Sequence, residues 1–404
     1  MVKKLWNKNF VLLLQSSAVS TIGDLMYSIA IGFWVYSKTG SSALMGIMSS
    51  ISMLVTMFLS PFSGSIVDKC NRKWVIVAGD FFQGALMLTI GALAFMDKLS
   101  IPGVLIAAFL ASLGGVFYSP AVNTSLIDII PHDDMVRGQS LFSGMSSVIN
   151  TVGSAFSGAM IAFLGVPVII VINGLSNVYA AVSELFVSIP KTAQEGEAVS
   201  VKGVLRDTKT AVIEIFSDTH LKLFVPCTII INLIAAGPMS LLLPFVMEKG
   251  FTVAQYGYLI TVFTIGSLLS VILLGIIKLN GKARFWTMSI CFLASVVSLA
   301  LAFSANRFIP MCVFGFFGGF FNAAGNTVFS SAMMLALPEK NRGAILGFLS
   351  SACVGGSALS VVIYGFLGEI APLSIVFVVG NLLSLVPMMV FCLNKKTKEF
   401  ITTH

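Results

Sequence analysis

Long apolar runs separated by short polar breaks make up most of this chain. Residues 43–62 carry no charge, and residues 74–96 carry only Asp80. A run of this length can cross about 30 Å of hydrocarbon at about 1.5 Å per residue, and in lipid it satisfies its backbone groups as a helix. The pattern therefore predicts an all-α polytopic membrane protein with twelve transmembrane helices. The predicted spans are 10–36, 42–66, 74–96, 101–127, 138–163, 166–189, 221–246, 253–277, 285–304, 308–336, 343–367 and 371–393.

The basic residues between these spans are unevenly distributed. Of the 24 Lys and Arg, four fall on one side of the predicted membrane. These four are Lys38, Lys98, Lys249 and Arg307. The remainder lie on the other side, and loops rich in Lys and Arg stay in the cytoplasm. We therefore expect a multi-pass protein of the plasma membrane, in contact with membrane lipid, with both termini in the cytoplasm.

The longest polar segment divides the chain into two halves of six spans. It covers residues 191–218, and similar motifs occur on either side of it. The paired motifs are Gly114-Gly115-Val-Phe117 with Gly318-Gly319-Phe-Phe321, Asn123-Thr124 with Asn326-Thr327, and Arg137-Gly138 with Arg342-Gly343. The sequence predicts a six-helix bundle over 1–190, a cytoplasmic central loop over 191–218, and a second six-helix bundle over 219–404.

Composition excludes several classes of protein. The 404 residues are 57% hydrophobic and 10% charged, whereas soluble domains carry about 25% charged residues. The net charge of +7 comes from bases confined to loops and ends, so we expect no nucleic-acid partner. The six cysteines lack metal-ligand spacing, and motifs for phosphate loops, zinc proteases or nucleophile elbows are absent. We expect neither an enzyme nor a cofactor or metal.

The break after the second span has a distinctive spacing. It reads Gly64-Ser-Ile-Val-Asp68-Lys69-Cys-Asn71-Arg72-Lys73. This spacing resembles the loop between helices 2 and 3 of major facilitator transporters. Asn71 stands where that family has a second glycine, and we expect it to take the left-handed backbone that Asn tolerates best after Gly. The resemblance implies the major facilitator fold, in which two six-helix bundles are related as parallel repeats.

The resemblance also implies a cytoplasmic gate. In the family, an aspartate–arginine–aspartate arrangement ties cytoplasmic helix ends together. The matching residues here are Asp68, Arg72 and Asp128, and Asp128 closes the fourth span. Alternatively, Asp128 caps the segment before Pro131. The full set of gate candidates is Gly64, Asp68, Lys69, Arg72, Lys73 and Asp128.

Asp24 is the most costly residue of the chain for a membrane protein. It lies near the middle of the first span, where a carboxylate costs about 2.5–3.5 kcal/mol on insertion scales. We interpret it as the residue that couples protons to substrate, with a buried acid bonded to a neighbouring helix as the alternative. Asp80 and Glu184 lie nearer the cytoplasmic ends of their spans and either snorkel or pair locally.

Other polar residues in the spans are candidates for lining a cavity. Gly237-Pro238 predicts a kink in the seventh span, at the place that corresponds to Asp24 in the repeat. Broken helices near the midplane are where transporters bind substrate, although a packing kink is an alternative. Asparagines also bond helices together in lipid. The cavity candidates are Gln15, Asn123, Asn150, Asn173, Asn232, Pro238, Asn322 and Asn326.

Finer motifs resemble one group within the family. Ser20-x-x-Gly23-Asp24, Lys38-Thr39-Gly40-Ser41 and Pro131 with Arg137-Gly138 are similar to the macrolide-efflux and enterobactin-exporter group of bacterial drug:proton antiporters. The resemblance implies a monomer that exports amphipathic, drug-like small molecules in exchange for protons.

Two departures from the antiporter pattern keep other functions open. Ala111 stands in place of the helix 4 arginine, and no proline lies between Gly153 and Gly158. A uniporter or an importer of another small solute therefore remains an alternative. A transport-inactive sensor or assembly partner on the same scaffold is another.

Overall fold

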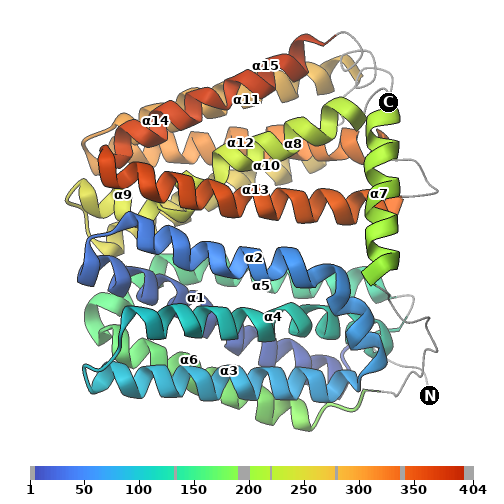
Figure 1. The fold of residues 1–404 in the computed structure, drawn as a ribbon, viewed down its shortest axis with the longest axis vertical. Coiled ribbons are helices and arrows are strands. Elements are labelled where there is room, and N and C mark those ends of the chain that lie inside the picture. The colour runs from blue at the N-terminus through green and yellow to red at the C-terminus, as the bar shows by residue number, and fades with distance from the viewer. Residues whose placement is uncertain are drawn as a thin grey trace. The chain divides into compact units, whose positions relative to one another are not determined.

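The computed structural model describes residues 5–131, 134–189, 201–218, 221–277, 281–336 and 342–394. The regular structure in these ranges is α-helical, which confirms the predicted fold class (Figure 1). The helices are α1 (Lys8–Thr39), α2 (Ser42–Lys69), α3 (Arg72–Phe95), α4 (Ile101–Ile129), α5 (Met135–Leu164), α6 (Val166–Leu185), α7 (Val201–Ser217), α8 (Leu221–Ser240), α9 (Leu242–Glu248), α10 (Val253–Ile276), α11 (Gly281–Ser304), α12 (Phe308–Ala336), α13 (Arg342–Ile370), α14 (Leu373–Leu383) and α15 (Leu385–Leu393).

The number of membrane spans agrees with the sequence pattern. Within the described residues, 11 helical segments are long and apolar enough to cross a membrane. The count reaches 12 when the two arms of α5 are taken as one span bent by 54°. That bend falls between Gly153 and Gly158, two glycines with no proline between them. The chain is therefore a multi-pass membrane protein.

The connection between α2 and α3 is shorter than the polar stretch in the sequence. The predicted spans leave residues 67–73 between them, but α2 continues to Lys69 and α3 begins at Arg72, so the connection consists of Cys70 and Asn71. Asn71 precedes α3 with φ −71° and ψ 103°. The expectation of a left-handed Asn71 is therefore wrong: a residue before a helix normally takes an extended backbone, which needs no glycine.

The seventh predicted span is broken close to the predicted kink. α8 contains Pro238 and ends at Ser240, and α9 resumes at Leu242. The backbone N–H of Gly237 donates to the Ser360 hydroxyl oxygen of α13 at 2.9 Å. Proline lacks an N–H and clashes with the preceding turn. The last predicted span is likewise divided, at Ser384 between α14 and α15.

The described helices gather into two compact units. The first unit comprises Met1–Gly40 and Leu54–Ser200, and the second unit comprises Ser41–Met53 and Val201–His404. The start of α2 belongs to the second unit because it bonds to α13: Glu369 Oε1 accepts from the Ser41 hydroxyl at 2.7 Å and from the Ala43 N–H at 3.0 Å. The sequence-based division into bundles at 190 and 219 stays a prediction.

In the first unit, α3 and α6 pack most closely. Gly84 of α3 faces Gly174 and Val178 of α6 so tightly that an added Cβ would lie 2.7 Å from Val178 Cγ2 and 3.0 Å from the Gly174 carbonyl oxygen. Small residues allow helix backbones to approach in this way in membranes. This contact fixes the spacing between two helices that carry buried acids.

We expect Gly84→Ala to destabilise the first unit by about 1–3 kcal/mol, since overpacking a dense contact forces backbone shifts. The measurement is the thermal unfolding temperature of purified protein in detergent. Gly115→Ala in α4 is the matched control, because a Cβ there meets nothing within 4 Å. If both variants unfold at the wild-type temperature, the close approach of α3 and α6 is not a packing constraint.

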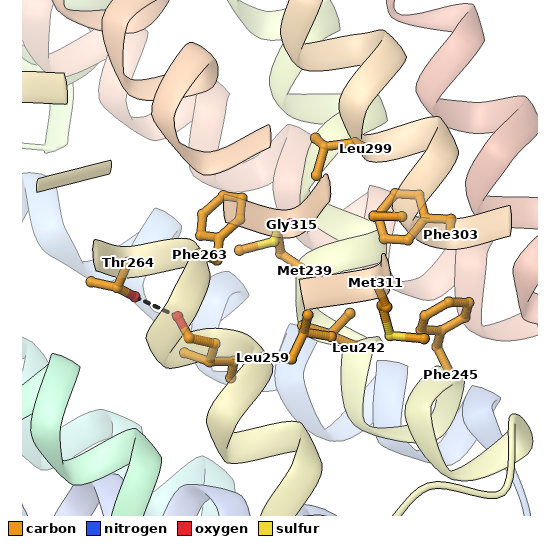
Figure 2. Close-up of a pocket in the computed structure, with 12 residues that line it drawn as sticks. Met239, Leu242, Phe245, Leu259, Phe263, Thr264, Leu299, Phe303, Met311 and Gly315 are labelled. Atoms are coloured by element: carbon orange, nitrogen blue, oxygen red, sulfur yellow. Dashed lines mark hydrogen bonds between the residues drawn. The ribbon is translucent and has the colours of Figure 1, made fainter. Parts of the chain in front are cut away.

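The second unit contains an apolar cavity of about 170 Å³ (Figure 2). Its walls come from α8, α9, α10, α11 and α12. Thr264 is a polar member of the lining, and its hydroxyl donates to the Ile260 carbonyl oxygen of its own helix at 2.8 Å. None of the polar cavity candidates lines this space.

The central segment contributes α7, which packs on α8 and α13, whereas residues 191–200 lie outside the described ones.

Candidate functional site

Asp24 lies at the contact between α1 and α6. Its Oδ1 accepts a hydrogen bond from Asn177 Nδ2 at 3.3 Å. The Asn177 amide also donates to Asn173 Oδ1 at 2.7 Å, and both asparagines are buried. Asp24 itself is exposed. The arrangement is a carboxyl group at the surface of the first unit, attached to its core through two amides.

The backbones of α1 and α6 approach closely beside this carboxyl group. At Gly23, an added Cβ would lie 2.2 Å from the Ser176 hydroxyl oxygen and 2.7 Å from Asn173 Oδ1. Glycine is therefore the residue that lets α6 bring its amides to Asp24. The spacing Gly23-Asp24 places the close contact and the acid one residue apart.

Asp80 of α3 and Glu184 of α6 form a second polar cluster in the first unit. Both side chains are buried, and their carboxyl groups lie within hydrogen-bonding reach of each other. Glu184 Oε1 accepts from the Ser16 hydroxyl at 3.0 Å and from the Tyr118 hydroxyl at 3.3 Å. Of the two alternatives, snorkelling and local pairing, the structure has local pairing.

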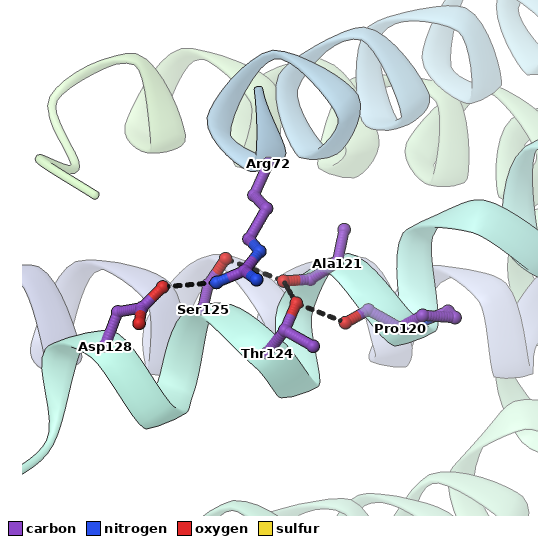
Figure 3. A network of polar contacts seen from close by, with 6 residues as sticks. All are labelled: Arg72, Pro120, Ala121, Thr124, Ser125 and Asp128. Atoms are coloured by element: carbon purple, nitrogen blue, oxygen red, sulfur yellow. Dashed lines mark hydrogen bonds and ion pairs between the residues drawn. The ribbon is translucent and has the colours of Figure 1, made fainter. Parts of the chain in front are cut away.

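The gate candidates Arg72 and Asp128 form an ion pair across the ends of α3 and α4 (Figure 3). Arg72 Nη1 lies 2.5 Å from Asp128 Oδ2, and the exposed fractions of the two side chains are 11% and 17%. Beside the pair, the Ser125 hydroxyl of α4 donates to the Ala121 carbonyl oxygen at 2.6 Å. The pair is thus mostly shielded from water, where removal of one partner is costly.

The remaining gate candidates are only partly described. Gly64, Asp68 and Lys69 lie in the last turns of α2, and their side chains are outside the described ones. Lys73 Nζ donates to the Leu185 carbonyl oxygen, the last of α6, at 2.6 Å. A cation at that position complements the negative end of the α6 dipole.

The cavity candidates are distributed over both units. Gln15 Nε2 donates to the Ser183 hydroxyl oxygen of α6 at 3.1 Å, so it joins two helices of the first unit. Asn123 is exposed on α4. Three others bond back to their own helices through Nδ2: Asn150 to the Ser146 carbonyl oxygen at 2.8 Å, Asn232 to the Thr228 carbonyl oxygen at 2.9 Å, and Asn326 to Asn322 Oδ1 at 3.0 Å. Pro238 is buried beside the break in α8.

Sequence reasoning missed the hydrogen-bonding roles of three residues that complete these clusters. Asn177 follows Asn173 by four positions, a spacing that puts both amides on one face of a helix and could have identified it. Tyr118 and Ser16 have no such signal, because tyrosine and serine are common in helices of every kind. Among the described residues, no group of three or more His, Cys, Asp or Glu could hold a metal ion.

Comparison with known proteins gives relatives named for efflux. Macrolide efflux protein A of Streptococcus pyogenes is 26% identical over 186 residues, 46% of this chain and 46% of that protein. Multidrug efflux pump Tap of Mycobacterium tuberculosis is 28% identical over 160 residues, 38% of each chain. The chain thus spans less than half the length of the curated relatives it matches.

Solved structures and a family model extend the likeness over nearly the whole chain. The nucleoside transporter NupG has a TM-score of 0.75 at 13% identity and covers 94% of this chain and 97% of its own. A bacterial homologue of the iron transporter ferroportin has a TM-score of 0.71 at 16% identity, covering 95% and 98%. These likenesses show the fold. A family model described as transmembrane secretion effector matches residues 3–400, and the chain belongs to this family of major facilitator transporters.

Proposed function

We propose that this chain exports amphipathic, drug-like small molecules across the bacterial plasma membrane by alternating access, in exchange for protons. The observation that carries the proposal is Asp24, an acid near the middle of α1 whose carboxyl group accepts a hydrogen bond from the neutral Asn177 amide and is exposed. An acid inside a membrane-spanning segment is a functional candidate because it is expensive to keep there. The relatives named for macrolide and multidrug efflux support the direction and the substrate class.

Asp24 suits proton exchange because its partner carries no charge. Asn177 can donate to either protonation state of the carboxyl group, so gaining or losing a proton leaves the contact with α6 in place. A basic partner would instead fix the charged state. The absence of an arginine at Ala111 is consistent with a site that relies on amides.

The ion pair between Arg72 and Asp128 supports a gate on the cytoplasmic side. It joins the first turn of α3 to the last turn of α4, while Lys73 ties α3 to the end of α6. Breaking such contacts and forming them again gives a transporter two discrete arrangements, which alternating access requires.

Labelling of single cysteines tests the orientation. In a variant lacking the six native cysteines, we expect Ser41→Cys and Lys249→Cys to react with an impermeant reagent added outside intact cells. Epitope tags before Met1, inside 191–218 and after Lys398 should react only after the cells are permeabilised, because loops rich in bases remain in the cytoplasm. External reaction of the tag in 191–218 would contradict the twelve-span topology.

The transport proposal itself is tested in a host lacking its own drug pumps. Cells expressing the chain should accumulate less of a macrolide and of other amphipathic cations than cells with an empty vector, and an uncoupler should abolish the difference. Efflux that is unaffected by the uncoupler would favour a uniporter. Absence of transport for every compound, at normal expression, would favour a sensor or assembly partner.

A further inference from the structure

The buried acids Asp80 and Glu184 belong to a cluster that the proposed role of Asp24 does not use. Asp80 is 5% exposed and Glu184 is 1% exposed. They face each other across the closest helix pair of the first unit, α3 and α6, where Gly84 brings the backbones together. A membrane-spanning segment keeps such residues only at a substantial cost in insertion energy. The two buried carboxyl groups therefore require either a partner of opposite charge or a bound proton.

Among the described residues, the surroundings of the two acids supply hydroxyl groups but no cation. Glu184 Oε1 accepts from Ser16 and Tyr118, whereas Asp80 Oδ2 and Glu184 Oε2 are buried without any donor. In the described part of the chain, neither acid makes an ion pair. Two carboxylates in contact, both deprived of water, repel each other strongly. One proton shared between them removes the repulsion and turns one carboxyl group into a donor for the other.

The charged groups on the neighbouring helices do not change this balance. On α1 the nearest acid is Asp24, which adds negative charge, and on α4 the facing group is the Tyr118 hydroxyl. The bases at the start of α3 are engaged elsewhere: Arg72 with Asp128, and Lys73 with the Leu185 carbonyl oxygen.

Hydroxyl groups also lead from the pair toward Asp24. The Tyr118 hydroxyl touches Glu184 and lies 3.4 Å from the Ser17 hydroxyl oxygen. Ser17, Ser20 and Asp24 follow one another at helical spacing on α1, and both serines are buried. The two acidic sites of the first unit are thus linked by polar side chains through an otherwise apolar bundle.

We propose that Asp80 and Glu184 bind one proton between them and form a second proton-binding site, distinct from Asp24. The binding of the proton stands on the geometry of the pair alone. Its use in transport rests on the proposed proton coupling: the pair holds a proton on the cytoplasmic side of the bundle and exchanges it with Asp24 through the hydroxyl groups of Tyr118 and Ser17.

Infrared spectroscopy of the purified protein tests proton binding without any substrate. The wild type should show the C=O band of a protonated carboxyl group, shifted in D₂O and lost as the pH is raised. Asp24→Asn removes the other acid that is proposed to carry a proton and should retain the band. In that background, Asp80→Asn and Glu184→Gln each replace the proton of the pair with an amide donor of the same size, so each should remove the band. An Asp24→Asn protein without this titrating band, or a band that survives both added pair substitutions, would overturn the proposal.

A macrolide added to weakly buffered protein in detergent tests the role in transport. We expect the wild type to release more protons per macrolide bound than Glu184→Gln, with Asp24→Asn releasing only the share that belongs to the pair. Equal release by Glu184→Gln and the wild type would overturn the role of the pair in transport. If neither the wild type nor the variants release protons, the proposed proton coupling is wrong. The infrared band then still decides whether the pair binds a proton.

Discussion

Asp24→Asn is expected to abolish accumulation of substrate against its gradient while leaving downhill exchange in place. The amide keeps the size and polarity of the side chain and its contact with Asn177, but it cannot gain or lose a proton. Without an exchangeable proton at this position, the free energy of the proton gradient cannot drive export of the substrate. The measurements are uphill export and substrate counterflow in reconstituted vesicles with an imposed pH gradient.

Two further variants show whether the effect belongs to the carboxyl group. Asp24→Glu keeps an exchangeable proton on a longer side chain, so we expect partial uphill export with a shifted pH optimum. Ser28→Ala removes an exposed hydroxyl one turn further along α1, where Ser28 bonds only to the Leu25 carbonyl oxygen of its own helix, and should export like the wild type. If Asp24→Asn still concentrates substrate at the wild-type rate, Asp24 is structural and coupling resides elsewhere.

Asp128→Asn is expected to stop transport although the protein is still inserted in the membrane. The substitution leaves the Arg72 guanidinium mostly buried without its carboxylate, at a cost of about 3–5 kcal/mol. That energy shifts an equilibrium between two conformations by about two to four decades. The measurement is efflux at equal expression, and Asp68→Asn is expected to have the same consequence through the same gate.

A double variant separates gating from stability. Arg72→Gln with Asp128→Asn removes both charges of this pair, so its unfolding temperature should recover toward the wild-type value while transport stays lost. Lys38→Gln is the matched control, because Lys38 lies 3.6 Å from Asp97 in a pair whose side chains are 55% and 92% exposed. Exposed pairs contribute about 0–1 kcal/mol. Wild-type transport by Asp128→Asn would exclude the gate role of this ion pair.

The sequence alone was sufficient to predict the features that the membrane imposes on the chain. Spans such as α3 follow from the length of an apolar run, because unpaired backbone groups are costly in lipid and a helix pairs them within one segment. The pairing of Arg72 with Asp128 was predicted from a resemblance, and the break near Pro238 from the missing N–H of proline. The spans and the break near Pro238 depend on local chemistry, which a single segment of sequence carries.

The tertiary structure decided what each polar group touches. Nothing in the spacing of Asp80 and Glu184 indicates that they meet, because their contact depends on how Gly84 lets α3 approach α6. Likewise, the packing of α1 on α6 decides which asparagine bonds to Asp24, and in the structure it is Asn177. Three cavity candidates, Asn150, Asn232 and Asn326, instead donate within their own helix. Hydropathy specifies which segments are helical, but the rotation and depth of each helix are set by side-chain packing between segments far apart in sequence.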